Sequence, residues 1–154
     1  LIDYWLEKLS DAGIERFLIN THYLNDKVEK YISSSKFSEL IEVSYERELL
    51  LTAGTIVANK DFFQDKSFML IHADNLSICD FSNFINCHNK RPKGTEITMM
   101  TFETDEPHNC GIVELDERGI VCDFHEKIEN PPSSFANAAV YILEPTVILS
   151  ISVK

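Results

Sequence analysis

Hydrophobic residues near the beginning of the chain repeat with the spacing of one helix face. Trp5, Leu6 and Leu9 lie three, four and seven residues after Ile2. Residues at this spacing line one side of a 3.6-residue helix, so they predict an amphipathic helix. Gly13 follows at a position where a helix can end, because glycine accepts the left-handed backbone of a helix terminus.

The next segments alternate between apolar runs and helical spacing. In the helix that follows the first apolar run, we expect Val28, Tyr31 and Ile32 to face inward. Asp80 is a suitable N-cap, because its carboxylate can accept a backbone hydrogen bond at the start of a helix. The predicted elements are strands at 17–23, 41–45 and 68–73 and helices at 25–32, from about 52, and at 81–88.

The second half of the chain changes to strands. The turn from Asp116 to Gly119 separates two of them and predicts a hairpin. Pro145 suits the first turn of a final helix, where a backbone donor is not needed. The predicted strands cover 97–102, 112–115, 120–124 and 136–143. We therefore predict one three-layer α/β domain over residues 1–154, with a mixed sheet that is parallel in its first half and partly antiparallel in its second.

The charged residues argue against one class of partner. The chain has 14 Lys and Arg against 25 Asp and Glu, which gives a net charge of -11. This charge repels a polyanion, so we expect no binding of nucleic acid. A small phosphorylated ligand is compatible with it, because a few local cations, backbone N–H groups or a metal ion suffice to bind phosphate.

Cysteines and apolar segments indicate a compartment. The four cysteines form no Cys-x-x-Cys pair and lie within or beside apolar segments, so we expect buried free thiols in a reducing compartment: Cys79, Cys87, Cys110 and Cys122. No segment approaches the roughly 20 apolar residues that span a bilayer, and the first residues lack the basic region of a secretion signal. We predict a cytoplasmic protein with no membrane partner.

One carboxylate directly follows an apolar strand. Asp74 stands between Ala73 and Asn75, after the predicted strand 68–73. Ligands of open α/β sheets bind at the carboxyl ends of strands, where an aspartate can hold Mg²⁺ together with substrate phosphates. An N-cap or turn aspartate explains the same residue equally well.

The helix that opens near residue 52 is a second candidate site. Thr52, Ala53 and Gly54 are small, so a ligand can approach the backbone N–H groups at this helix terminus. The helix dipole favours phosphate at the same place. A plain helix cap is the simpler interpretation of these residues.

Three polar residues near later strands are candidates for contact with a sugar phosphate. Lys127 can neutralise a phosphate, and Glu126 can accept hydrogen bonds from sugar hydroxyls. Ordinary surface charge explains this pair equally well. Asn137 lies inside an apolar run, where its amide needs hydrogen-bond partners, either from a ligand or from the backbone.

Other chemistries find no support in the sequence. A Gly-x-Ser-x-Gly segment and a Cys/His signature are both absent, which argues against nucleophilic catalysis. The five histidines lack the spacing of metal ligands, so we assign none of them to zinc: His22, His72, His88, His108 and His125.

In this order, the segments resemble the sugar-1-phosphate nucleotidyltransferases, particularly the guanylyltransferases that act on mannose 1-phosphate. The resemblance spans nearly the whole chain and implies their Rossmann-like nucleotidyltransferase fold. The family's Leu-Gly-Thr-Ala-Gly segment matches residues 50–54, except that Leu51 stands where glycine is expected. The family's Ala-Asp-Asn strand end matches residues 73–75.

Three further family segments match less closely. Tyr-Gly is similar to residues 110–111, Glu-Lys-Pro to 126–128, and Asn-Ala-Gly to 137–139, where Ala139 replaces glycine. The resemblance implies that Asp74 is the metal ligand and that Mg²⁺ is the cofactor. It also implies the following roles: catalysis by Asp74 and Lys127, nucleotide binding by Thr52, Ala53, Gly54 and Asp74, and sugar-phosphate binding by Gly111, Glu126, Lys127 and Asn137.

The family's N-terminal Gly-rich loop contains Gly-Thr-Arg and is followed by a Lys-Pro pair. This loop has no counterpart in this chain, because residues 1–5 resemble the family sequence that comes just after the Lys-Pro pair. That loop would cradle the triphosphate and supply cations. We therefore expect a domain that is incomplete at its N-terminus and continues beyond Lys154, and a chain that is inactive alone.

The reaction implied by the resemblance transfers a nucleotidyl group from a nucleoside triphosphate to a sugar 1-phosphate. GTP is the expected nucleotide donor. Mannose 1-phosphate or a related hexose or heptose phosphate is the expected acceptor. Thymidylyl, uridylyl or cytidylyl transfer is an alternative within the same class. A non-catalytic sensor of nucleotide sugars is an alternative from another class, and Leu51 and Ala139 fit it. The sequence is compatible with a homo-oligomer.

Overall fold

The computed structural model describes residues 1–63 and 66–151. The chain divides into two compact units. The first, the parallel unit, contains residues 2–67 and the chain from residue 144 onward. The second, the antiparallel unit, contains residues 68–143 together with residue 1.

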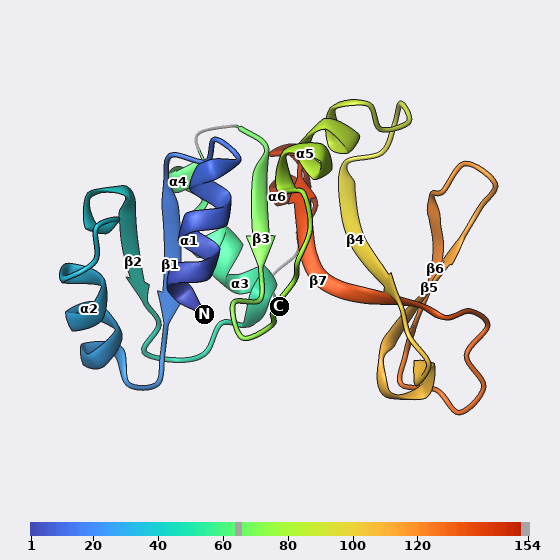
Figure 1. Ribbon diagram of the computed structural model, residues 1–154, viewed down its shortest axis with the longest axis horizontal. Helices are drawn as coiled ribbons and strands as arrows, with labels where there is room; N and C mark the ends of the chain where they lie inside the picture. Colours follow the sequence, from blue (N-terminus) through green and yellow to red (C-terminus); the bar gives the residue numbers. More distant parts are fainter. Residues whose placement is uncertain (64–65, 152–154) are drawn as a thin grey trace. The chain divides into compact units, whose positions relative to one another are not determined.

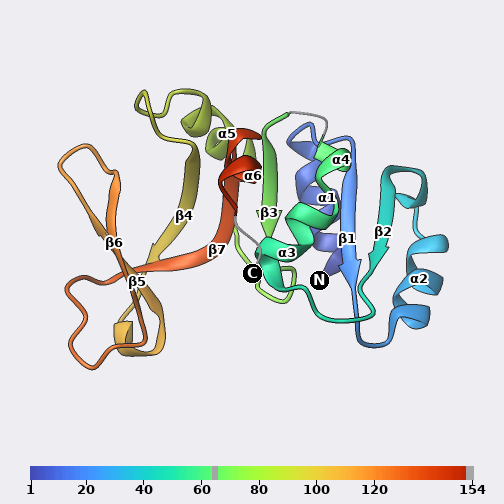
Figure 2. The same ribbon diagram turned by 180° about the vertical axis from the view of Figure 1, so that it is seen from behind.

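The parallel unit alternates helices and strands, as the sequence predicts (Figure 1). Strands β1 and β2 pair in parallel, from Phe17 opposite Ile41 to Thr21 opposite Tyr45. Helix α2 lies against β2, and α3 and α4 follow one another along the chain (Figure 2). The elements are α1 Ile2–Asp11, β1 Phe17–Thr21, α2 Asn25–Ser33, the 3-10 helix η1 Ser38–Leu40, β2 Ile41–Tyr45, α3 Leu51–Ala58, α4 Lys60–Phe63 and α6 Thr146–Ser150.

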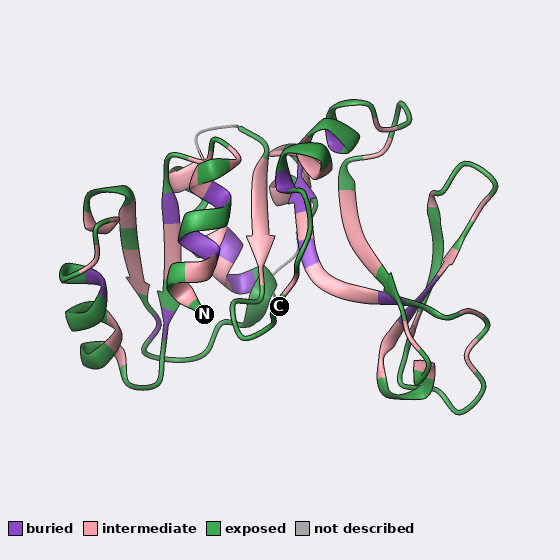
Figure 3. Cartoon of the chain, viewed as in Figure 1, coloured by how far each residue is buried: buried purple, intermediate pink, exposed green. Residues whose placement is uncertain are grey.

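Apolar side chains at helical spacing form the core of the parallel unit, together with strand residues. The helix predicted from the first hydrophobic positions is confirmed as α1, which carries buried stretches coloured purple in Figure 3. Its buried residues are Trp5, Leu6 and Leu9. Ile32 of α2 is also buried, as predicted. The prediction that Tyr31 faces inward is wrong, because this side chain stays 46% exposed and donates its hydroxyl hydrogen bond to Asp3.

The antiparallel unit is a five-stranded sheet organised around its longest strand, β7. Strands β3, β4 and β5 all pair antiparallel with β7, and β6 pairs with β5. Ile112 of β5 lies opposite Ala136 of β7, and both are fully buried. The elements are β3 Phe68–Ile71, α5 Phe81–Asn89, β4 Ile97–Glu103, the 3-10 helix η2 Pro107–Asn109, β5 Gly111–Leu115, β6 Val121–Glu126 and β7 Phe135–Leu143.

Strand β7 contains a bulge where it pairs with β4. Met99 lies opposite Tyr141, but Thr101 lies opposite Asn137, so residues 138–140 of β7 face a single residue of β4. Ala139 takes up the extra length with a left-handed backbone of φ 56°. Bulges of this kind bend a strand and redirect its side chains.

The predicted α/β class is confirmed, with parallel pairing in the first part of the chain and antiparallel pairing in the second. In the described part of the chain, these two kinds of pairing occur in separate sheets. Asp80 caps α5 as predicted, with its carboxylate accepting a hydrogen bond from the Asn83 N–H at 2.9 Å. Across residues 1–63 and 66–151, no helix has the length and apolar content needed to cross a membrane.

The prediction that the cysteines are buried is wrong. Cys79, Cys87 and Cys122 are exposed, and Cys110 is half-buried. All four are free thiols, as expected. Their neighbours in sequence are apolar, but burial is decided by which face of the helix or strand each one occupies.

Candidate functional site

Asp74 lies in the turn that follows β3. The strand ends at Ile71, two residues earlier than predicted, although the His72 N–H still donates to the Ala139 carbonyl of β7 at 3.1 Å. The turn is closed by a hydrogen bond from the Asn75 N–H to the His72 carbonyl at 3.1 Å. The Asp74 carboxylate is therefore exposed at the carboxyl end of a strand, as the sequence pattern predicts.

Asn137 lies directly before the bulge of β7. Its side-chain amide donates to the Tyr141 hydroxyl at 2.6 Å, and its Oδ1 accepts from the Ala139 N–H at 2.9 Å. The amide therefore has partners within its own strand, as the alternative without a ligand requires. The hydrogen bond from His72 to Ala139 joins this bulge to the end of β3. Asp74 lies two residues after His72, and Asn137 lies two residues before Ala139.

Gly111, Glu126 and Lys127 meet at the open end of the β5–β6 hairpin. Gly111 lies opposite Glu126, and a Cβ atom at Gly111 would stand 2.6 Å from the Phe124 ring and 2.9 Å from Glu126 Oε2. Only glycine leaves room for this approach. The Lys127 N–H donates to the Cys110 carbonyl at 3.2 Å, and its Nζ lies 3.8 Å from Glu126 Oε1.

The β5–β7 pairing connects this hairpin end to the bulge of β7. Ile112 faces Ala136 across the two strands, and Gly111 and Asn137 are the next residues on either side of that pair. Because antiparallel neighbours run in opposite directions, both residues lie toward the same end of the junction. The structure thus brings the candidate sugar-phosphate residues together in the antiparallel unit, next to the segment that carries Asp74.

Thr52, Ala53 and Gly54 form the first turn of α3 in the parallel unit. The N-cap residue is Leu50, and its side chain makes no capping hydrogen bond, so the interpretation of Thr52 as a plain cap is wrong. Gly54 is buried, and a Cβ atom there would lie 2.9 Å from the Leu50 Cβ. Close contact within this turn therefore requires a glycine at position 54, whereas Thr52 and Ala53 are exposed.

Glu46 is the residue that sequence reasoning missed. It follows β2 and is only 4% exposed, and its Oε2 accepts a hydrogen bond from the Leu50 N–H at 3.1 Å. Its Oε1 accepts from the hydroxyl of Thr55 in α3 and, at 3.4 Å, from the Asn20 amide at the end of β1. One carboxylate thus connects both strands of the sheet to the helix that carries the candidate nucleotide site. A signal was present, because Glu46 directly follows the predicted strand 41–45, as Asp74 follows the predicted strand 68–73.

The Glu46 backbone adds two further contacts. Its N–H donates to the Thr21 carbonyl at 2.8 Å, and its carbonyl lies 2.8 Å from Nδ1 of His22. The loop between β2 and α3 is therefore tied to the end of β1 by the main chain as well as by the side chain. This arrangement sets the position from which α3 begins.

Two positions where the family resemblance expects glycine have left-handed backbones. Leu51 has φ 60° and Ala139 has φ 56°. This conformation suits glycine, because a Cβ atom crowds the following carbonyl. The protein therefore keeps the backbone that glycine would adopt at both positions. Lys127, with φ 49°, shares this conformation in the antiparallel unit.

Comparisons with known proteins give the same family over the whole chain. The family model described as nucleotidyl transferase matches residues 1–154. The catalytic subunit beta of mannose-1-phosphate guanylyltransferase from Drosophila pseudoobscura pseudoobscura is 30% identical over 153 residues, which cover 97% of this chain and 41% of that protein. A UTP–glucose-1-phosphate uridylyltransferase from Synechocystis is 25% identical over 162 residues, covering 96% of this chain and 42% of that protein.

A solved structure from Bacillus anthracis, described as a glucose-1-phosphate thymidylyltransferase, has the same fold with a TM-score of 0.81 at 18% identity. That match covers 94% of this chain and 58% of the other. The chain spans less than half the length of the two relatives above, 41% of one and 42% of the other. On the family model that matches residues 1–154 and on the shared fold, the chain belongs to the nucleotidyl transferase family.

Proposed function

We propose that this chain is the part of a sugar-1-phosphate nucleotidyltransferase that binds the sugar phosphate and one side of the nucleotide. The observation that carries the proposal is the gathering of Gly111, Glu126, Lys127 and Asn137 around the β5–β7 junction, next to the strand end before Asp74. The family match and the relatives named for this chemistry support it.

In the proposed reaction, a phosphate oxygen of the sugar 1-phosphate forms a bond to the α-phosphorus of the nucleoside triphosphate. The bond from that phosphorus to the oxygen that bridges to the β-phosphate breaks, and pyrophosphate leaves with the electron pair. The attacking oxygen is already anionic near neutral pH, so no strong base is needed. The task of the protein is positioning and neutralisation of charge.

Lys127 and Glu126 suit the sugar-phosphate end of this reaction. The Lys127 side chain is 66% exposed, and its ammonium lies beside Glu126 at the open end of the hairpin, so it can reorient toward a phosphate. Glu126 offers carboxylate oxygens to sugar hydroxyls. Asn137 is held by Tyr141 and Ala139, so its role is to fix the bulge on which the sugar rests.

Asp74 is proposed as the ligand of a divalent metal ion. Its carboxylate is exposed at a strand end, and Mg²⁺ commonly uses one or two carboxylates together with substrate phosphates and water. A bound Mg²⁺ would neutralise charge on the nucleotide phosphates. Asp74 itself would hold the cation and leave the remaining coordination positions to the substrate.

The first turn of α3 is proposed to receive the nucleotide. Its backbone N–H groups at residues 52–54 are near the positive end of the helix dipole, and no N-cap side chain occupies them. Glu46 would set the orientation of this turn through Leu50 and Thr55. The guanylyltransferase relative favours GTP and mannose 1-phosphate, and the uridylyltransferase relative makes UTP the first alternative.

The test is pyrophosphate release by the full-length natural protein that contains this chain. With GTP, mannose 1-phosphate and saturating Mg²⁺, we expect Asp74→Asn to lower turnover by about 10²-fold or more, because charge stabilisation at the reacting phosphorus is lost. Asp105→Asn removes an exposed loop carboxylate of the same unit and serves as the matched control. Turnover of Asp74→Asn close to that of the wild type would refute the metal role.

A sensor that binds a nucleotide sugar without turnover is the second candidate. Leu51, which is 70% exposed at the start of α3, favours it, because its side chain stands where the family's glycine leaves the backbone open. Binding of a nucleotide sugar by the full-length protein, without pyrophosphate release for any of the four nucleoside triphosphates, would establish the sensor and exclude the enzyme.

A further inference from the structure

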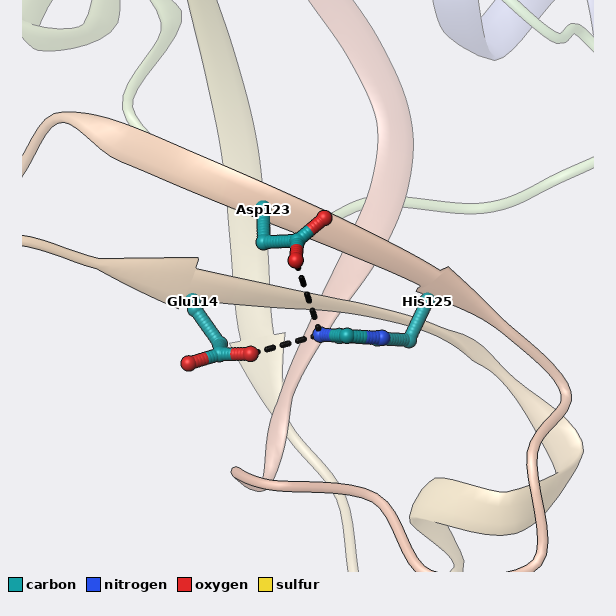
Figure 4. Close-up of side chains that lie close together, drawn as sticks. All are labelled: Glu114, Asp123 and His125. Carbon is teal, nitrogen blue, oxygen red and sulfur yellow. Dashed lines mark hydrogen bonds and ion pairs between the residues drawn. The ribbon is translucent and has the colours of Figure 1, made fainter.

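Three side chains of the β5–β6 hairpin converge on one point of its surface. Glu114 of β5 lies opposite Asp123 of β6, and His125 is two residues further along β6 (Figure 4). His125 Nε2 lies 2.6 Å from Glu114 Oε1 and 3.8 Å from Asp123 Oδ2. One ligand atom from each residue lies within 4.8 Å of the other two.

This cluster occupies the face of the hairpin away from the candidate sugar-phosphate residues. Side chains alternate between the two faces of a strand, so Asp123 and His125 share one face while Phe124 and Glu126 share the other. The contacts that a Cβ atom at Gly111 would make with Phe124 and Glu126 agree with this alternation. The cluster is therefore separate from the proposed substrate site.

The two carboxylates of the cluster share one histidine as their basic partner. Glu114 and Asp123 face each other across the strand pair, and like charges in that position repel. Among residues 1–63 and 66–151, no lysine or arginine forms an ion pair with either of them. His125 is half-buried between them, with 24% of its side chain exposed. The repulsion between the two carboxylates favours the binding of a cation at this point.

The backbone holds the cluster in place. The register of β5 and β6 shifts after Glu114, because Leu115 pairs with Val121 and leaves Cys122 as an extra residue. The bulge lies directly before Asp123, where it redirects the strand. The second oxygen of that carboxylate, Oδ1, accepts a hydrogen bond from the Phe124 N–H at 2.8 Å, which fixes its orientation.

The identity of the donors selects the kind of cation. One imidazole nitrogen and two carboxylate oxygens suit Zn²⁺, at bond lengths of about 2.0–2.2 Å. In a tetrahedral site such ligand atoms lie roughly 3.4 Å apart. The observed separations of 2.6 and 3.8 Å from His125 Nε2 are shorter and longer than this value, so small side-chain rotations would reach it. Mg²⁺ prefers oxygen donors alone and does not suit this set.

We infer that Glu114, Asp123 and His125 form a zinc-binding site on the outer face of the β5–β6 hairpin. The three protein ligands leave a fourth coordination position to water. The site cross-links the two strands of the hairpin, so a bound ion stabilises it. This inference does not depend on the nucleotidyltransferase activity proposed above.

The test titrates ZnCl₂ into the purified, tag-free 154-residue chain by isothermal calorimetry in a buffer that does not chelate metals. We expect one zinc ion per chain and an increase in the thermal midpoint on its addition. His125→Gln should weaken the affinity by at least about tenfold, as should Asp123→Asn. His108→Gln removes an exposed histidine of the same unit, and Glu117→Gln removes a hairpin carboxylate outside the cluster; both variants should bind zinc like the wild type.

Cobalt provides a readout of the ligands themselves. Co²⁺ bound to the wild-type chain should give the visible absorption of a four-coordinate site, and this absorption should be lost in His125→Gln. If zinc binds the wild type and His125→Gln equally, or if the chain takes up no zinc at micromolar concentration, the inference is wrong. The cluster is then a protein ion pair only, in which His125 alone balances the carboxylates.

Discussion

The two units of this protein hold their candidate residues in different ways. In the parallel unit, the first turn of α3 depends on a single buried side chain, because Glu46 joins Leu50 and Thr55 to the strand ends. In the antiparallel unit, the candidates lie on strands whose backbones deviate from regular pairing. Asn137 lies beside the bulge of β7, and Lys127 follows β6 with a left-handed backbone.

The two units should therefore be sensitive to substitution at different kinds of position. A carboxylate that satisfies several donors concentrates its effect in one side chain, and its loss leaves buried polar groups without partners. A strand position is held by many ladder hydrogen bonds, so one side chain matters less and the backbone conformation matters more. Substitutions in each unit test this contrast.

The largest effect is expected at Glu46. Replacing Glu46 with alanine removes the acceptor for Leu50, Thr55 and Asn20, and we expect the free energy of unfolding to fall by about 2–4 kcal/mol. Urea denaturation followed by circular dichroism measures this change. Glu48→Ala, at an exposed position of the same loop, should change stability by less than about 0.5 kcal/mol. Equal effects of the two substitutions would remove the contrast between the units.

A smaller effect of opposite sign is expected in the bulge of β7. Ala139 has a left-handed backbone, so Ala139→Gly should relieve strain and stabilise the protein by up to about 1 kcal/mol. Ala138→Gly, at the adjacent position of the same strand, should destabilise it by about 0.5–1 kcal/mol through added unfolded-state freedom. Thermal midpoints measured side by side give the comparison. If Ala139→Gly and Ala138→Gly lower the thermal midpoint by similar amounts, the backbone at Ala139 is not strained.

The matching substitution in the parallel unit is Leu51→Gly. Its φ of 60° predicts the same relief of strain as at Ala139. Because the Leu51 side chain is 70% exposed, little packing is lost. Similar stabilisation at both positions would show that backbone strain is common to the two units. The difference between the two units would then depend on Glu46 alone.

The smallest effect is a pH dependence in the hairpin turn. Hydrogen bonds from the Ile120 N–H first, and then from Arg118, lower the pKa of Asp116 below its ordinary value of 3.8. The unfolded chain therefore binds this proton at higher pH than the folded chain, so the stabilisation is complete well above 3.8 and is lost as the pH falls through the lowered pKa. Because 33% of the Asp116 side chain is exposed to solvent, screening keeps the effect small.

The measurement compares wild type with Asp116→Asn by urea denaturation between about pH 3 and pH 7. The stability difference between the two proteins should be constant near neutral pH and shrink in acid. Glu117→Gln, at the next turn position, should show no such trend. A difference that is independent of pH would contradict the assignment of the turn stabilisation to the Asp116 carboxylate.

Most elements of both units were predictable from hydrophobic spacing. The helix from Ile2 and the strands at 41–45 and 111–115 appear within a residue or two of their predicted bounds. Local signals also placed the N-cap at Asp80 and the turn after Asp116. These features depend on interactions between residues near each other in sequence, so a linear pattern contains them.

The candidate sites were predictable only in part. The strand ends near Asp74 and Lys127 could be recognised from local sequence, because Asp74 follows an apolar run and Lys127 belongs to a charged pair at the end of a strand pattern. Neither the network of Glu46 nor the meeting of Glu114, Asp123 and His125 could, because each joins residues that are separated along the chain. Histidine spacing alone argued against zinc, and the zinc site inferred above rests instead on strand pairing that brings His125 beside two carboxylates.

The order and type of most elements and the acidic character of the chain follow from the sequence alone. Tertiary structure decided which strands pair, where β6 and β7 bulge, and which cysteines and tyrosines remain exposed. The physical reason is that periodicity records one face of a single element. Register, by contrast, depends on which partner strand that face meets, and one residue of slip reverses every side chain.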